Sequence, residues 1–210
     1  MRAADITGMV LAGGQGSRMG GVDKGLQLFQ GQALARLALQ RLAPQVGHTA
    51  VNANRHRDTY LAWGVPVWTD APGREAFAGP LAGFLSGLEH CGTDYLCTVA
   101  CDTPLFPHDL VARLAQGLTR DQADIAMAAG PEGDGGLRTQ PVFCLMKTGL
   151  SASLRQFMQD GGRKIEAWTH SQRSTVVRFD QPSDDPRAFF NINTLRDLAL
   201  LESRAAPAKP

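Results

Sequence analysis

The feature that most constrains the fold of this chain is a repeated switch between two apolar periods. Apolar runs of strand length alternate with longer segments whose apolar residues recur at the period of an amphipathic helix. The expected strands are residues 6–13, 48–54, 65–70, 94–102, 123–129, 140–146, 174–179 and 188–193. The expected helices are residues 32–46, 55–64, 79–91, 107–118, 150–162 and 194–204. This alternation predicts an α/β fold, with a mostly parallel sheet and helices on both of its faces.

The length of the chain, 210 residues without an internal repeat, suits one domain with a sizeable core. We expect that domain to span residues 1–204 and to be followed by a disordered tail, residues 205–210. A glycine-rich stretch inside it, residues 130–140, is expected to be a loop, either a mobile lid or an ordinary surface loop.

The charge balance limits the partners that the chain can have. The formal net charge is +1 and there is no polybasic run, so we expect neither a nucleic-acid nor a membrane partner, and any anion site must be local. The first apolar run is too short for a signal peptide, and no stretch approaches the length of a membrane span. The four cysteines form no C-x-x-C pair and are expected to be reduced and buried, which predicts a cytoplasmic location.

The first expected strand leads into a glycine-rich loop, "MVLAGGQGSRMGGVDKG", residues 9–25. Its spacing misses the dinucleotide motif G-x-G-x-x-G by one residue, and it lacks the P-loop motif G-x-x-x-x-G-K-[ST]. Glycines still allow backbone N–H groups to face phosphate oxygens, and Arg18 and Lys24 supply cations. From the glycines alone, an ordinary turn with solvated cations explains the loop equally well.

Short polar side chains recur where the expected strands end. Asn52, Asp70, Asp102 and Asn191 each follow a different strand, and the carboxyl ends of parallel strands share one edge, where ligands bind. Asp102 is the strongest metal candidate, because it leaves a buried strand and Mg²⁺ takes one or two carboxylates together with waters and phosphates. A role as the cap of the helix near residue 107 is less favoured, because two residues intervene.

Five motifs in order resemble the MobA-type molybdenum cofactor guanylyltransferases. They are "LAGGQGSRMGGVDKG", "VNANRH", "GPLAG", "CDTP" and "FFNINT", and the first alone is similar to a wider class of nucleotidyltransferases. The resemblance implies a Rossmann-like three-layer α/β/α sandwich, as in nucleotide-diphospho-sugar transferases. It implies GTP with Mg²⁺ as one substrate and molybdenum-bound molybdopterin as the other. The terminal phosphate of molybdopterin would attack the α-phosphorus of GTP and release pyrophosphate.

The resemblance also implies roles for residues of this sequence. The GTP-binding residues would be Leu11, Ala12, Gly13, Gly14, Lys24, Asn52, Asp70, Gly79, Pro80, Leu81 and Asp102. Asp102 would also bind the metal. The acceptor-binding residues would be Arg18, Gly21, Asn191 and Asn193, and the catalytic residues would be Lys24, Asp102 and Arg18. Before Met19 the loop has Arg18 as its only cation, whereas relatives in this family can carry more. This departure from the family pattern bears on how the loop binds phosphates.

Other functions remain open on the sequence alone. A cytidylyltransferase for the same cofactor, or a nucleotidyltransferase for another small-molecule phosphate, fits the same motifs. An NAD-dependent oxidoreductase fits poorly, because the glycine spacing fails and Asn52 stands where an acidic residue would be expected. A GTP-binding adaptor without turnover would leave Asp102 and the Asn191/Asn193 pair without a shared purpose. Cofactor-insertion and molybdoenzyme-maturation proteins are further expected partners.

Overall fold

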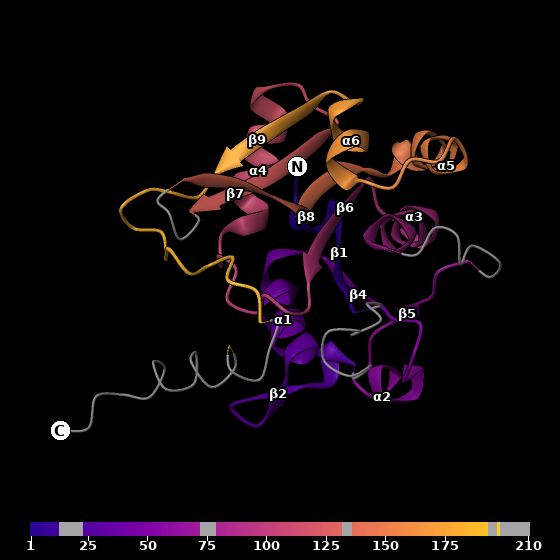
Figure 1. The fold of residues 1–210 in the computed structure, drawn as a ribbon, viewed down its shortest axis with the longest axis vertical. Coiled ribbons are helices and arrows are strands. Elements are labelled where there is room, and N and C mark those ends of the chain that lie inside the picture. The colour runs from indigo at the N-terminus through magenta and orange to yellow at the C-terminus, as the bar shows by residue number, and fades with distance from the viewer. Residues whose placement is uncertain (13–22, 72–78, 132–135, 193–196, 198–210) are drawn as a thin grey trace.

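A computed structural model describes residues 1–12, 23–71, 79–131, 136–192 and 197. Its centre is a seven-stranded sheet in the order β5-β4-β1-β6-β8-β7-β9 (Figure 1). The strands are β1 Ile6–Leu11, β4 His48–Asn52, β5 Val67–Trp68, β6 Tyr95–Ala100, β7 Ile125–Pro131, β8 Leu137–Lys147 and β9 Ser174–Arg178. Of these strands only β8 runs antiparallel to its neighbours, so the predicted mostly parallel sheet is confirmed.

Helices cover both faces of this sheet (Figure 1). They are α1 Leu34–Leu42, α2 Arg57–Leu61, α3 Pro80–His90, α4 Leu110–Arg120, α5 Ser151–Gln159 and α6 Ile165–His170. α1 and α4 contribute to one buried apolar cluster, and α3, α5 and α6 to another. Neighbouring residues of β1 point to opposite sides, with Met9 in the second cluster and Val10 in the first, as a strand buried on both faces requires. The predicted three-layer α/β/α arrangement is confirmed.

The predicted last strand, residues 188–193, is wrong over the residues that the structure describes. Residues 188–189 end a turn, in which the Phe190 N–H donates to the Arg187 carbonyl at 2.9 Å, and residues 190–192 are irregular. Phe189 is buried against the rings of Phe143 and Phe179, at centroid distances of 5.1 and 5.5 Å. The apolar pattern here therefore reflects side-chain packing of an irregular segment, and strand pairing plays no part.

The glycine-rich stretch 130–140 is also corrected, since most of its described residues are strand. Gly130 and Pro131 end β7, and residues 137–140 begin β8, which pairs with it. Two elements were not predicted. They are α6 and a hairpin of β2 Leu28–Phe29 with β3 Gln32–Ala33, whose turn residues Gln30 and Gly31 both have positive φ.

The predictions for the end of the chain fall outside the described residues. These are the tail, residues 205–210, and the helix over 194–204, apart from position 197. The extent of the single domain, residues 1–204, stays a prediction. Within the described ranges, no helix has the length and apolar character needed to span a membrane.

Candidate active site

The carboxyl ends of three neighbouring strands form the edge on which the site is built. Leu11, the last residue of β1, lies in register with Asn52 of β4 on one side and Ala100 of β6 on the other. The Ala12 N–H donates to the Asn52 carbonyl at 2.8 Å, and the Cys101 N–H donates to the Leu11 carbonyl at 3.2 Å. Leu11 and Ala12 therefore lie at the centre of this edge. Gly13, Gly14, Arg18 and Gly21, which follow in the chain, lie outside the described residues.

On the β4 and β5 side of the edge, two amides hold one carboxylate. The Asn52 amide Nδ2 donates to Asp70 Oδ1 at 2.9 Å, and the Asn54 Nδ2 donates to Asp70 Oδ2 at 2.8 Å. The Asp70 N–H in turn donates to Asn54 Oδ1 at 2.9 Å. We call these three residues the Asp70 cluster. It brings together Asn52 and Asp70, which the resemblance assigns to GTP binding, in a fixed arrangement.

The amino end of α3 packs over the same strand ends. Pro80 occupies the first turn of α3, as predicted, and Gly79 before it has a φ of 141°, a conformation that favours glycine. Leu81 is buried, whereas Gly79 and Pro80 are exposed. One turn further, a Cβ on Gly83 would lie 2.7 Å from both Asn52 Oδ1 and Leu11 Cδ2. The glycine therefore lets the helix approach the Asp70 cluster.

On the β6 side of the edge lies a pair of opposite charges. The Lys24 Nζ donates to Asp102 Oδ2 at 3.2 Å, and the two side chains are 20% and 21% exposed. α4 begins later in the chain, with Asp109 at its N-cap position, so Asp102 does not cap that helix. A carboxylate and an ammonium held at a strand end, and still reached by solvent, can contact a phosphate and its metal ion. Among the described residues there is no group of three or more His, Cys, Asp or Glu side chains that could hold a metal ion.

Beyond Asp102, a segment from the far end of the chain joins the site. The Thr103 hydroxyl donates to Asn191 Oδ1 at 2.6 Å, and the Ile192 N–H donates to the Asp102 carbonyl at 2.8 Å. Ile192 is buried with Phe29 and Leu34. Asn191 is thus fixed beside Asp102, while Asn193 lies outside the described residues. Along the edge the order is Asp70, Asn52, Leu11 and Asp102, and Asn191 lies beside Asp102.

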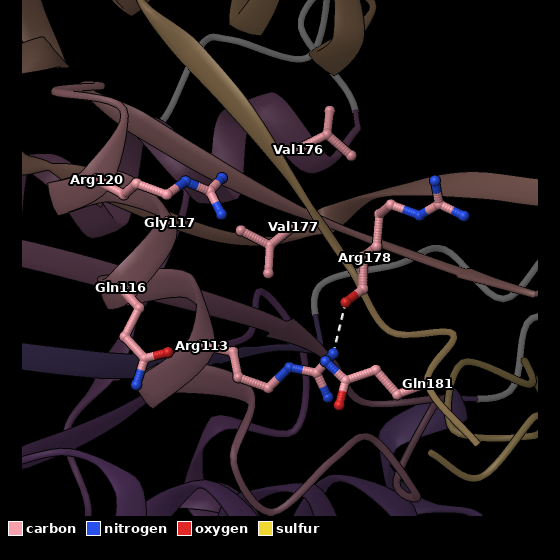
Figure 2. A pocket seen from close by; sticks show the side chains of 8 residues that line it. All are labelled: Arg113, Gln116, Gly117, Arg120, Val176, Val177, Arg178 and Gln181. Carbon is pink, nitrogen blue, oxygen red and sulfur yellow. Dashed lines mark hydrogen bonds between the residues drawn. The ribbon is translucent and has the colours of Figure 1, made fainter. Parts of the chain in front are cut away.

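A second concave region lies between α4 and the edge strand β9, and it is not part of this site (Figure 2). Three arginines line it, but each is already paired with a carboxylate: Arg113 with Asp184, Arg120 with Asp121, and Arg178 with Asp180. Two strands, β8 and β7, separate β9 from β6. The charge in this hollow is neutralised within the chain, so nothing there indicates an anion site.

Comparison with known proteins identifies the family. Residues 8–176 match the MobA-like NTP transferase domain. The chain belongs to this family. It is 61% identical to a molybdenum cofactor guanylyltransferase of Acidovorax ebreus over 203 residues, which cover 94% of this chain and 95% of that protein. It is 56% identical to a protein of the same name from Albidiferax ferrireducens over 210 residues, which cover 97% and 99% of the two chains.

Solved structures agree with the fold of a MobA-like NTP transferase. The molybdopterin-guanine dinucleotide biosynthesis protein A of Archaeoglobus fulgidus superposes with a TM-score of 0.73 at 20% identity, covering 95% of this chain and 98% of that one. The 4-diphosphocytidyl-2C-methyl-D-erythritol synthase of Anaerococcus prevotii gives a TM-score of 0.70 at 10% identity, covering 97% and 99%. Both comparisons bear on the fold alone.

The candidate site contains residues to which the sequence analysis assigned no role. Thr103 links Asp102 to Asn191, and Asn54 holds the second oxygen of Asp70. Thr103 directly follows Asp102 and Asn54 lies two positions after Asn52, so their places at strand ends were available as a signal. Asp23 and Tyr60, which contact each other at 2.9 Å, carried no comparable signal, because they lie 37 positions apart.

Proposed function

We propose that the chain transfers GMP from GTP to molybdenum-bound molybdopterin, which yields the guanine dinucleotide form of the cofactor and pyrophosphate. The observation that carries the proposal is the order of groups along one sheet edge. The Asp70 cluster lies at the ends of β4 and β5, and the Lys24–Asp102 pair lies at the end of β6 with Asn191 beside it, in a chain that is 61% identical to a molybdenum cofactor guanylyltransferase over most of its length.

That order separates two sides of the reaction. The nucleoside of GTP would bind on the side of Asn52 and Asp70, against Leu11, Ala12 and the start of α3, which holds Gly79, Pro80 and Leu81. Gly13 and Gly14 would complete this side. The acceptor phosphate would bind on the side of Asn191, together with Asn193, Arg18 and Gly21. The triphosphate would then lie at the centre, over Lys24 and Asp102. Two strand spacings, about 10 Å, separate β4 from β6, which leaves room for a nucleotide to extend along the edge.

The proposed reaction needs no covalent intermediate with the protein. A phosphate oxygen of the acceptor forms a bond to the α-phosphorus of GTP, and the bond from that phosphorus to the β-phosphate oxygen breaks. Because the attacking oxygen is already ionised, no strong general base is needed. The main barrier is repulsion between two anions, which Lys24 and Arg18 would offset by placing positive charge beside the phosphates.

Mg²⁺ fits the residues present. Asp102 is a partly exposed carboxylate at a fixed strand end, and its partner Lys24 is a cation that a second cation could replace. Mg²⁺ is commonly held by one or two carboxylates, with waters and substrate phosphates as its other ligands. Mg²⁺ bound there would neutralise negative charge on the triphosphate. A reducing cytoplasm is the proposed location, in keeping with four unpaired cysteines.

The product identifies the function directly. The protein is incubated with molybdenum-bound molybdopterin, Mg²⁺ and each nucleoside triphosphate in turn, and the products are identified by mass. The expected products are the guanine dinucleotide cofactor and pyrophosphate, with GTP alone as efficient donor. A cytosine dinucleotide product would make the chain a cytidylyltransferase. Bound GTP without pyrophosphate would make it an adaptor, and either result would refute the proposal.

A further inference from the structure

A buried carboxylate directly precedes the Lys24 that the proposed function uses. Asp23 is 5% exposed, and its Oδ1 accepts two hydrogen bonds, from the Gly25 N–H at 3.0 Å and from the Tyr60 hydroxyl at 2.9 Å. A carboxylate in such a place is costly unless it is well paired. Both of these hydrogen bonds to Oδ1 come from the chain itself.

Asp23 shapes the turn on which Lys24 stands. It is the N-cap of a short 3-10 helix, Lys24–Leu26, and the bond from Gly25 to its side chain closes that turn. Ordinary N-cap bonds of this kind stabilise by about 1 kcal/mol. Lys24 is the first residue of the turn, so the direction in which its side chain leaves the backbone depends on this cap.

The turn is closely packed around Gly25. A Cβ on Gly25 would collide with the Tyr60 hydroxyl and would lie 3.1 Å from Ala35 Cβ and 3.2 Å from Ala12 Cβ. Ala12 follows β1 and Ala35 belongs to α1. The glycine therefore presses the turn onto the strand end that carries the site, next to the helix that covers it.

Tyr60 contacts the turn from a different element of the fold. It belongs to α2, is fully buried, and packs edge-on against Trp63 at a centroid distance of 4.9 Å. Burial, and then the neighbouring Asp23 carboxylate, raise the pKa of Tyr60 far above its usual value, so its hydroxyl stays protonated and can donate. The hydrogen bond to Asp23 consequently links α2, through the cap, to Lys24.

We propose that Asp23 and Tyr60 are positioning residues, which hold the Lys24 ammonium 3.2 Å from the Asp102 carboxylate and in place for the triphosphate. Neither residue would touch substrate. The inference rests on the proposed function for its kinetic consequence, but the placement of Lys24 can be measured without turnover.

The first test is a double-mutant cycle on GMP transfer. Tyr60→Phe removes one hydroxyl, and kcat is expected to fall about 10-fold, the effect of losing one hydrogen bond to a charged group. In a Lys24→Ala background the same change should have no further effect, because it acts through Lys24. Tyr95→Phe, at the amino end of β6, is the matched control and should leave kcat unchanged. An equal fall in both backgrounds, or none in either, would overturn the inference.

The second test separates position from loss of fold. Asp23→Asn keeps an oxygen that can accept both bonds, whereas Asp23→Ala removes the cap. Asp23→Asn should therefore restore most of the kcat that Asp23→Ala loses, with both variants folded by thermal melting. If the asparagine variant is as impaired as the alanine variant, the carboxylate acts by its charge and the positioning role is refuted.

The third test does not need the reaction. The protein is treated with a water-soluble N-hydroxysuccinimide ester of acetate. The rate at which Lys24 is acetylated is measured by peptide mass spectrometry in wild type and in Tyr60→Phe. Lys147, held by its own ion pair with Asp124 at 2.7 Å, is the internal reference. Lys24 should react several-fold faster in the variant while Lys147 does not change. This result would support positioning even if the wild type made no guanine dinucleotide, a failure of the proposed function alone. Unchanged Lys24 reactivity would refute the positioning role.

Discussion

A single ion pair decides much of the behaviour expected of the site. Lys24 and Asp102 form an ion pair with each other, and both remain about one-fifth exposed. A partly exposed pair of this kind contributes little to stability, at most about 1 kcal/mol. Its value lies in preorganisation, since both charges already stand where a phosphate and a metal ion would meet them.

Asp102→Asn is the sharpest single change at this pair. The amide keeps the shape and an oxygen acceptor for Lys24 but removes the negative charge that would bind Mg²⁺. We expect kcat/KM to fall about 100-fold and the Mg²⁺ concentration for half-maximal rate to rise. Initial rates of pyrophosphate release across a Mg²⁺ titration measure both. Asp109→Asn, an exposed carboxylate at the start of α4, is the control, and a normal Mg²⁺ midpoint in Asp102→Asn would contradict the metal role.

The sequence predicted candidate site residues where a polar side chain follows an apolar run that forms a strand. Asn52, Asp70 and Asp102 each follow an apolar run, and the parallel register brings those ends to one edge. The Asp23–Tyr60 contact was not predictable, because it joins two segments that are distant in sequence and depends on how α2 packs. In the sequence, Asp23 and Lys24 are simply two adjacent polar residues, and the burial of Asp23 is known only from the fold.

At the scale of elements, α3 is placed by two glycines on one face. A Cβ on Gly83 would clash with the side chains of Asn52 and Leu11, and a Cβ on Gly87 would clash with those of Met9 and Leu96. Both positions need the absence of a side chain so that the helix can lie close to the sheet. They differ in their neighbours, since Gly83 abuts a polar atom of the site and Gly87 abuts flexible apolar side chains.

Gly83→Ala should therefore impair binding more than folding. The new methyl group would displace the Asn52 amide and disturb the Asp70 cluster, although alanine improves helix propensity by about 1 kcal/mol. We expect GTP affinity, measured by calorimetry, to fall at least 10-fold, or about 1.4 kcal/mol. Gly87→Ala is the matched control and should lower the melting temperature without changing GTP affinity. Equal affinities in the two variants would show that the Asp70 cluster does not contact the nucleotide.

Elements with a clear period were predicted, and those without one were not. β1, β4, β6 and α4 follow clean apolar patterns and were found with small shifts at their ends. α6 has six residues, too few for its period to be recognised. Residues 188–192 look like a strand, but their apolar side chains fill a gap beside Phe143 and Phe179. Packing of that kind is decided by the tertiary structure and leaves no periodic signal.

For the molecule as a whole, one carboxylate connects the strands farthest from the site. Asp124, directly before β7, accepts from the Lys147 Nζ at 2.7 Å and from the Arg173 Nε at 2.8 Å. Lys147 ends β8 and Arg173 precedes β9. These hydrogen bonds lower the pKa of Asp124 to about 2, Arg173 contributing most and Lys147 next. Ion pairs of Asp124 thus connect β7, β8 and β9 at one end of these strands.

The pH dependence of stability follows from this shift. The pKa of Asp124 is lower in the folded state than the ordinary value of 3.8, so its contribution is present above about pH 4 and is lost as the pH falls towards 2. Asp124→Asn should cost about 1 kcal/mol of unfolding free energy at pH 7, after allowance for solvent screening. Urea unfolding at pH 7 and pH 3 measures this, with Asp94→Asn as control. If Asp124→Asn loses the same unfolding free energy at pH 3 as at pH 7, the lowered pKa of Asp124 is contradicted.

The hydrogen bonds that fix Asn191 beside Asp102 and Thr103 have a consequence for synthesis of the chain. Every described residue of the nucleotide side comes from the first half of the sequence, up to Asp102, and the matched family domain ends at residue 176. Asn191 and Ile192 reach the site only from beyond that point. On the ribosome, the segments proposed to bind GTP are therefore synthesised well before the segment that carries Asn191, which must reach the site last.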